Sequence, residues 1–312
     1  MGYTFHMKIL KNILSQLDKF QQRHRFTAFS HAVVKKYGED NVGNQAALLT
    51  YYGFLSLFPL LMVLTTVLNN VLGNNSQLRE RAIDGLTDYF PLLGDQLSTH
   101  VQSLGGSGFA LVIGILFALY GARGVAEAFR KGVQHVWQIP ESQRDKFPKS
   151  TLKSLTMLVV GGGSFILASL LAGWAASQGG HGLVIRGISV LLNVLILFLL
   201  FNFLINISLP RHLPLKQTKT GAIVAAIGLV LLQTLGGYIL TRELRNLDAL
   251  YSYFALALGL LFWIYLQAQI VCYAMVTAYV SSRKLWPRSL GPHKTGVDKQ
   301  LAAARKKRAG GI

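Results

Sequence analysis

The chain has 312 residues, of which 51% are hydrophobic and only 14% are charged, and its formal net charge is +18. Ordinary soluble proteins have about 25% charged residues, so this composition excludes an ordinary soluble domain and indicates a membrane protein. The single cysteine, Cys272, excludes an intramolecular disulfide.

The first candidate membrane span covers residues 46–68 and contains no charged residue. About 20 apolar residues are needed to cross a hydrocarbon layer roughly 30 Å thick, so this run is long enough. Pro59 lies in its middle and predicts a kink that faces protein or a cavity, because neighbouring groups must satisfy the carbonyl that proline frees. Tyr51 and Tyr52 place two hydroxyl groups just inside the span, near its N-terminal end.

The connection from 69 to 107 is much longer than a simple loop. Its stretch "SQLRERAIDGLTDYF" has apolar residues at helical spacing and ends at Pro91, and "LLGDQLSTHVQSL" can form a second helix. We expect a helical hairpin that lies on the outer face of the membrane or dips into the helix bundle.

The second candidate span, 108–129, contains two charged residues, Arg123 and Glu127. They are four residues apart, so they can pair on one face of a helix. Charged groups at membrane depth are costly and usually face a cavity or a partner, which favours a substrate or gating role. The alternative is an anchor, because Arg123 lies far enough along the span for its side chain to reach the cytoplasmic headgroups.

Four more candidate spans follow, at 155–177, 187–209, 220–241 and 249–282. The fourth contains Asn202 and Asn206 on one face, which we expect to make hydrogen bonds between helices or to line a substrate path. The sequence therefore predicts an all-α integral membrane protein with six transmembrane helices.

Basic residues are distributed very unevenly between the two sides of these spans. The N-terminal segment 1–45, the tail 283–312 and the connections on the same side contain 25 Lys and Arg, and the opposite connections contain 5. Basic residues mark the cytoplasmic side, so both termini are predicted to be cytoplasmic. The tail is polar and basic, so we expect it to be disordered and attracted to anionic headgroups rather than to nucleic acid.

Catalytic and metal-binding patterns are absent from the sequence. No two of the eight histidines are three or four residues apart, and no HExxH or GxSxG motif occurs. We therefore expect no enzymatic activity, no metal and no cofactor.

Three segments resemble one family. "AALLTYYGFLSLFPLLMVL" is similar to the first span of the YihY/BrkB family of bacterial inner-membrane proteins, and "GARGVAEAFRKGVQHVWQIPESQRDKFPKSTLKSL" is similar to its second-span motif and following loop. The tyrosine-led last span, "LYSYFALALGLLFWIYLQAQIVCYAMVTAYV", matches in outline. The resemblance implies a bacterial inner-membrane protein that transports an envelope component such as a lipid. Family members have also been called ribonucleases, a role that this sequence does not support.

Two functional hypotheses follow. In the first, the chain is a transporter or translocator of an anionic or lipid-like component, with Tyr51, Tyr52, Pro59, Arg123, Glu127, Asn202 and Asn206 along the path. In the second, it is a membrane scaffold that uses the outer hairpin and the basic tail as docking surfaces. A cavity that reaches Arg123 would favour the first hypothesis, and a solid bundle would favour the second.

Overall fold

The computed structural model describes residues 16, 18, 20–71, 108–177, 182–210, 213–243, 249–290 and 295–309. Across these residues the secondary structure is helical, with no strand, in agreement with the predicted all-α fold. The helices are α2 (Arg25–Glu39), α3 (Gly43–Val71), α6 (Gly108–Val136), the short 3-10 helix η2 (Glu141–Gln143), α7 (Lys149–Ser177), α8 (Gly182–Ser208), α9 (Leu215–Glu243), α10 (Ala249–Arg283) and α11 (Gly296–Ala309).

Five helices, α6 to α10, are long and apolar enough to cross a membrane. They coincide with the second to sixth predicted spans, and the helix of the first predicted span is α3, which has 29 residues. A sixth crossing by α3 stays a prediction. The predicted outer hairpin between 69 and 107 lies outside the described residues except for its first three positions, which belong to α3.

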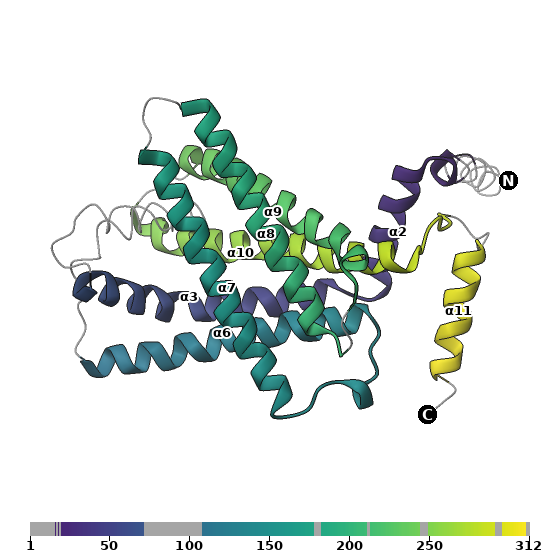
Figure 1. The fold of residues 1–312 in the computed structure, drawn as a ribbon, viewed down its shortest axis with the longest axis horizontal. Coiled ribbons are helices and arrows are strands. Elements are labelled where there is room, and N and C mark those ends of the chain that lie inside the picture. Colours follow the sequence, from purple (N-terminus) through teal and green to yellow (C-terminus); the bar gives the residue numbers. More distant parts are fainter. Residues whose placement is uncertain are drawn as a thin grey trace.

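The six long helices form a closed sequence of neighbours. α6 packs on α3, α3 on α10, α10 on α9, α9 on α8 and α8 on α7, and α7 and α8 return to α6. Figure 1 shows α3, α6 and α10 lying side by side, with α7, α8 and α9 running obliquely to them. The first residues of α3, α7 and α9 and the last residues of α6, α8 and α10 lie at one end of the bundle, which we call the terminal end because α2 and α11, the first and last labelled helices, lie there.

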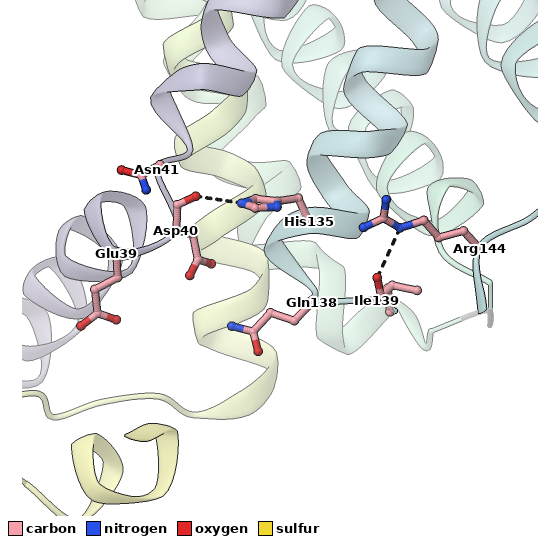
Figure 2. Close-up of a pocket in the computed structure, with 7 residues that line it drawn as sticks. All are labelled: Glu39, Asp40, Asn41, His135, Gln138, Ile139 and Arg144. Atoms are coloured by element: carbon pink, nitrogen blue, oxygen red, sulfur yellow. Dashed lines mark hydrogen bonds between the residues drawn. The ribbon is translucent and has the colours of Figure 1, made fainter. Parts of the chain in front are cut away.

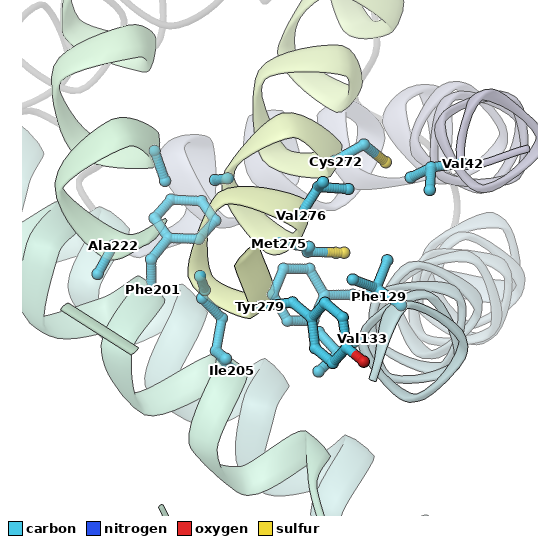
Figure 3. Close-up of a cluster of buried hydrophobic side chains, with 14 of the residues drawn as sticks. Val42, Phe129, Val133, Phe201, Ile205, Ala222, Cys272, Met275, Val276 and Tyr279 are labelled. Atoms are coloured by element: carbon cyan, nitrogen blue, oxygen red, sulfur yellow. The ribbon is translucent and has the colours of Figure 1, made fainter. Parts of the chain in front are cut away.

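Among the side chains that the structure describes, the main hydrophobic core lies toward the terminal end, and Figure 3 shows part of it. Val42, Val133, Ile205 and Met275 have at most 1% of their surface exposed. Farther along the same helices, Leu116 on α6 is 62% exposed, as expected where helices face lipid. Close packing is not confined to the terminal end, because Leu260 is fully buried farther along and a Cβ atom added at Gly236 on α9 would lie 1.7 Å from the Trp263 ring on α10.

Glycine allows two pairs of helices to approach closely. A Cβ atom added at Gly124 on α6 would lie 2.3 Å from the Tyr52 ring on α3, and one added at Gly221 on α9 would lie 2.4 Å from the carbonyl oxygen of Ala274 on α10. Small residues commonly serve this purpose in membrane helices, where close packing replaces the hydrophobic effect as the driving force.

The basic tail differs from the disordered segment that the sequence predicts. Residues 296–309 form α11, and Arg288 and Ser289, which follow α10, are 3% and 2% exposed. They are ordered because the Asp298 carboxylate accepts hydrogen bonds from the Ser289 backbone (3.0 Å) and from Arg288 Nε (3.0 Å). Lys35 of α2 also pairs with Asp298 at 3.2 Å, so the tail is fastened to the N-terminal helix.

Candidate functional site

A cavity of about 340 Å³ lies between five of the long helices, next to the hydrophobic core. Its walls come from α3, α6, α8, α9 and α10, and most of its lining is apolar: Leu49, Gly53, Leu57, Val125, Phe129, Phe201, Leu204, Leu229, Ile264, Ala268 and Val271. We call this space the central cavity. Its size and lining suit an apolar ligand group.

Two polar side chains complete the lining of the central cavity, Ser56 and Gln267. The Ser56 hydroxyl donates to the carbonyl oxygen of Gly53 in its own helix at 2.9 Å, so its donor is already used. The Nε2 atom of Gln267 is buried and has no hydrogen-bond partner among the residues that the structure describes. An unsatisfied buried donor costs about 1–3 kcal/mol, and a ligand with an acceptor oxygen would remove that cost.

The predicted pair of Arg123 and Glu127 does not form. Glu127 pairs instead with Lys131, one turn farther along α6, at 3.0 Å. Arg123 is exposed, forms no ion pair within the described ranges, and does not line the central cavity. Both partners are four residues from Glu127, and Lys131 lies nearer the terminal end, where water and headgroups lower the cost of the charges. The geometry thus agrees with the anchor interpretation of Arg123.

The two asparagines of α8 serve the packing of helices. Asn202 is buried and accepts a hydrogen bond from Thr218 of α9 at 3.1 Å. Asn206 closes the connection between α8 and α9, because its side chain donates to the Leu213 carbonyl at 2.8 Å and accepts from the Leu213 amide at 3.1 Å. Neither residue lines the central cavity.

The two tyrosines of the first span have different environments. Tyr52 packs against Gly124 and the core, whereas Tyr51 is 59% exposed on the outside of the bundle. Their rings contact each other edge to face, with centroids 5.2 Å apart. α3 continues through Pro59, whose side chain lies outside the described ones, so the predicted kink stays untested.

A second hollow, of about 420 Å³, lies at the terminal end and is polar: Glu39, Asp40, Asn41, His135, Gln138, Ile139 and Arg144 line it. Figure 2 shows how α2, α6 and the following loop meet here: His135 Nε2 lies 2.8 Å from the Asp40 carbonyl, and Arg144 Nε donates to the Ile139 carbonyl at 3.3 Å. These bonds join three segments, so we assign this terminal hollow a structural role.

Two polar residues that are buried near the terminal end, Lys36 and Tyr37, could not be singled out from the sequence. Lys36 is 1% exposed, pairs with Asp40 and lies 4.8 Å from the centre of the Tyr279 ring. Tyr37 stacks on Tyr273 with centroids 4.2 Å apart, donates to Gln269, and has its pKa raised to about 12, chiefly by burial. These residues lie in ordinary polar stretches, and only the contact between α2 and α10 buries them.

Comparison with known proteins identifies relatives of the whole bundle. Residues 33–297 match the family model described as virulence factor BrkB. The inner membrane protein YhjD of Escherichia coli is 25% identical over 81% of this chain and 80% of its own length. A Bacillus subtilis protein with a ribonuclease-like name, YfkH, is 24% identical over 83% of this chain and 98% of its own length. No solved structure matches this chain.

Proposed function

We propose that this chain, which belongs to the BrkB family and is a multi-pass inner-membrane protein, translocates a lipid-like component of the cell envelope. The observation that carries the proposal is the central cavity, whose walls are apolar and come from five membrane helices. The central cavity does not reach Arg123, as the criterion drawn from the sequence required, so the proposal rests on the size and the apolar lining of the cavity alone.

The lining of the central cavity favours an amphiphilic, lipid-like substrate over a small anion. Arg123, the charge that the sequence suggested for an anionic substrate, is exposed and absent from the lining, and no charged side chain is among the lining residues. A free anion in this space would be unpaired in a low-dielectric site, which costs several kcal/mol. An acyl chain suits the apolar walls, and an ester carbonyl suits the unpartnered amide of Gln267.

We further propose that the chain has no ribonuclease or other enzymatic role, and that both termini are cytoplasmic. Among the described residues, no three His, Cys, Asp or Glu side chains lie close enough together to hold a metal ion. The excess of basic residues at the terminal end supports the orientation.

The proposal is tested by filling the central cavity. The purified protein is reconstituted into liposomes with a fluorescent phospholipid, and the loss of outer-leaflet fluorescence on chemical reduction reports translocation. Leu204→Trp places a large ring in the cavity lining and should slow translocation about tenfold or more. Leu199→Trp on the same helix is the matched control, because Leu199 is 56% exposed and lies outside the lining.

The scaffold hypothesis has its own supporting observation, the ordered surface that α2, the segment after α10 and α11 form at the terminal end. If wild-type liposomes show no translocation above protein-free liposomes, and deleting 291–312 removes the cellular phenotype, the scaffold hypothesis replaces ours.

A further inference from the structure

The N-terminus of α7 has an unusual charge environment. The first turn of this 29-residue helix contains no acidic residue and begins with Lys149. Helix N-termini carry a partial positive charge and normally have acidic residues or bound anions nearby, so a lysine there is unfavourable without an anion.

A buried arginine adds to this positive charge. Arg130 of α6 is only 4% exposed, and its side chain reaches α7, where its guanidinium donates a hydrogen bond to the Ser150 hydroxyl. Its Nε atom is buried without a hydrogen-bond partner, and Arg130 forms no ion pair in the part of the chain that the structure describes. A buried guanidinium without a carboxylate in contact is costly, and an anion bound beside it would lower that cost.

The acidic groups nearby are already paired. Glu127 pairs with Lys131 at 3.0 Å, and Asp145 pairs with Lys153 at 2.6 Å. From 127 to 153 the sequence has six basic and three acidic residues, so the surroundings keep a net positive charge.

Ser150 is hydrogen-bonded to the buried Arg130 and is itself partly exposed at the surface of the bundle. Its oxygen accepts the hydrogen bond from Arg130, and no acceptor for its own proton is found within the described ranges. Its partial exposure leaves that donor accessible from outside the bundle. The Ser150 and Leu152 amides already donate to the carbonyls of Lys146 and Pro148, each at 3.1 Å, so the donors for a phosphate at this point are the Ser150 hydroxyl and the Lys149 ammonium.

Apolar side chains continue from this point along the outside of α7. Leu152, Leu155 and Val159 are 65%, 53% and 68% exposed and share one face by helical spacing. Lys149 lies on the same side of the helix, and the aromatic Phe147, 83% exposed, lies just before it. A basic group above an apolar stripe matches the charge pattern of a phospholipid, whose phosphate lies above its acyl chains.

We propose that the N-terminus of α7, with Lys149, Ser150 and Arg130, binds the phosphate of an anionic phospholipid whose acyl chain lies along Leu152, Leu155 and Val159. This α7 headgroup site is separate from the central cavity, because none of its residues lines that cavity. It does not depend on the translocation proposal.

The test uses full-length protein in phosphatidylcholine nanodiscs that contain a minor fraction of phosphatidylglycerol. Native mass spectrometry measures how many phosphatidylglycerol molecules stay bound. Lys149→Gln combined with Ser150→Ala should weaken retention about tenfold, as expected for losing hydrogen bonds to a charged group. Lys216→Gln is the matched control, since it removes one charge from an exposed position in the first turn of α9, at the same end of the bundle, and it should leave retention unchanged.

Three results would overturn the proposal. Retention by the double variant could equal that of the wild type, or Lys216→Gln could reduce retention as much as the double variant does, which would leave only a general charge effect. Displacement of phosphatidylglycerol by excess inorganic phosphate would assign the site to soluble phosphate instead. Ser150→Ala alone, which removes a partly exposed hydroxyl, keeps the test valid if the double variant folds poorly. Translocation plays no part in this readout.

Discussion

Arg288 and Glu39 are separated by 249 residues in sequence and form a two-pronged ion pair, with N–O distances of 2.8 and 2.9 Å. Arg288 also donates to Asp298 at 3.0 Å, so one buried guanidinium joins α2, the segment after α10 and the start of α11. This terminal clasp of Glu39, Arg288 and Asp298 is the basis of the first two predictions.

Removing Arg288 should release the tail. Arg288→Ala removes the two-pronged ion pair with Glu39 and one of the donors to Asp298, in a site where the arginine is only 3% exposed, and breaking a buried pair typically costs about 3–5 kcal/mol. We expect rapid proteolysis between 284 and 309, while the membrane bundle stays intact. Arg288→Lys should give only partial protection, because an ammonium cannot bind both Glu39 oxygens in parallel. Full protection in Arg288→Ala would show that the clasp does not hold the tail.

Mild acid should destabilise the packing at the terminal end, because it protonates His31. Burial lowers the pKa of His31 from its ordinary 6.5, and the nearby charges of Lys35 and Arg288 lower it further. The unfolded state then binds a proton at His31 more tightly than the folded state does. The stability linked to a neutral His31 is therefore fully present above pH 6.5 and falls as pH drops below that value toward the pKa of the folded state. Thermal unfolding of the wild type should shift downward between about pH 7.5 and about pH 5.5, and His31→Gln should shift less.

Titration of Asp298 should contribute nothing to this downward shift of the unfolding temperature. Its pKa is held well below the ordinary 3.8, because the hydrogen bonds from Ser289, Thr295 and Lys35 outweigh the effect of burial, which alone would raise it. The stability that the Asp298 carboxylate provides is present above pH 3.8 and is lost only as pH falls below 3.8. An equal shift in the wild type and in His31→Gln would contradict the role of His31.

Gln267 and Gln269 should respond oppositely to the same substitution. Gln269 accepts a hydrogen bond from Tyr37 and donates one to Tyr265, whereas the Nε2 of Gln267 has no partner among the described residues. Gln267→Leu should therefore raise the unfolding temperature, by the equivalent of about 1 kcal/mol or more, and Gln269→Leu should lower it. Thermal unfolding in one detergent compares the two. A loss of stability in Gln267→Leu would indicate a partner for its amide.

Gln267→Leu should also slow lipid translocation if the amide holds an ester carbonyl. A variant that is more stable and yet less active would separate function from folding. Unchanged translocation in this variant would remove Gln267 from the proposed path and leave only the apolar walls of the central cavity.

Arg123→Lys should keep full activity and membrane abundance. The guanidinium is exposed and the partner of Glu127 is Lys131, so a lysine can replace it as an anchor to headgroups. Quantitative membrane fractionation together with the liposome assay compares the two proteins. A clear loss of translocation at equal abundance would restore the substrate or gating role that the sequence suggested for Arg123.

Reporter fusions test the topology. A fusion after Asp95 and a fusion after Lys299 should report opposite sides of the membrane, because the basic residues gather at the terminal end. Reports from the same side would contradict the six-span arrangement with both termini cytoplasmic.

The sequence by itself determined which segments become long helices. A chain in lipid must satisfy its backbone hydrogen bonds internally, so uncharged runs such as 187–209 and 220–241 have essentially one possible structure, and α8 and α9 are found there. The same local logic predicted hydrogen bonds between helices for Asn202 and Asn206, and Asn202 forms one to Thr218 of α9, whereas Asn206 bonds to Leu213 in the connection between α8 and α9.

Only the tertiary structure decided the choice between equivalent partners and the contacts between distant segments. Arg123 and Lys131 are each four residues from Glu127, and the position of α6 within the bundle, not the spacing, selects Lys131. Spacing along the sequence also cannot show that Arg288 meets Glu39, or that Arg130 meets Ser150. Those pairs exist because packing buries charged groups that the sequence pattern assigns to solvent, and buried charges must find partners.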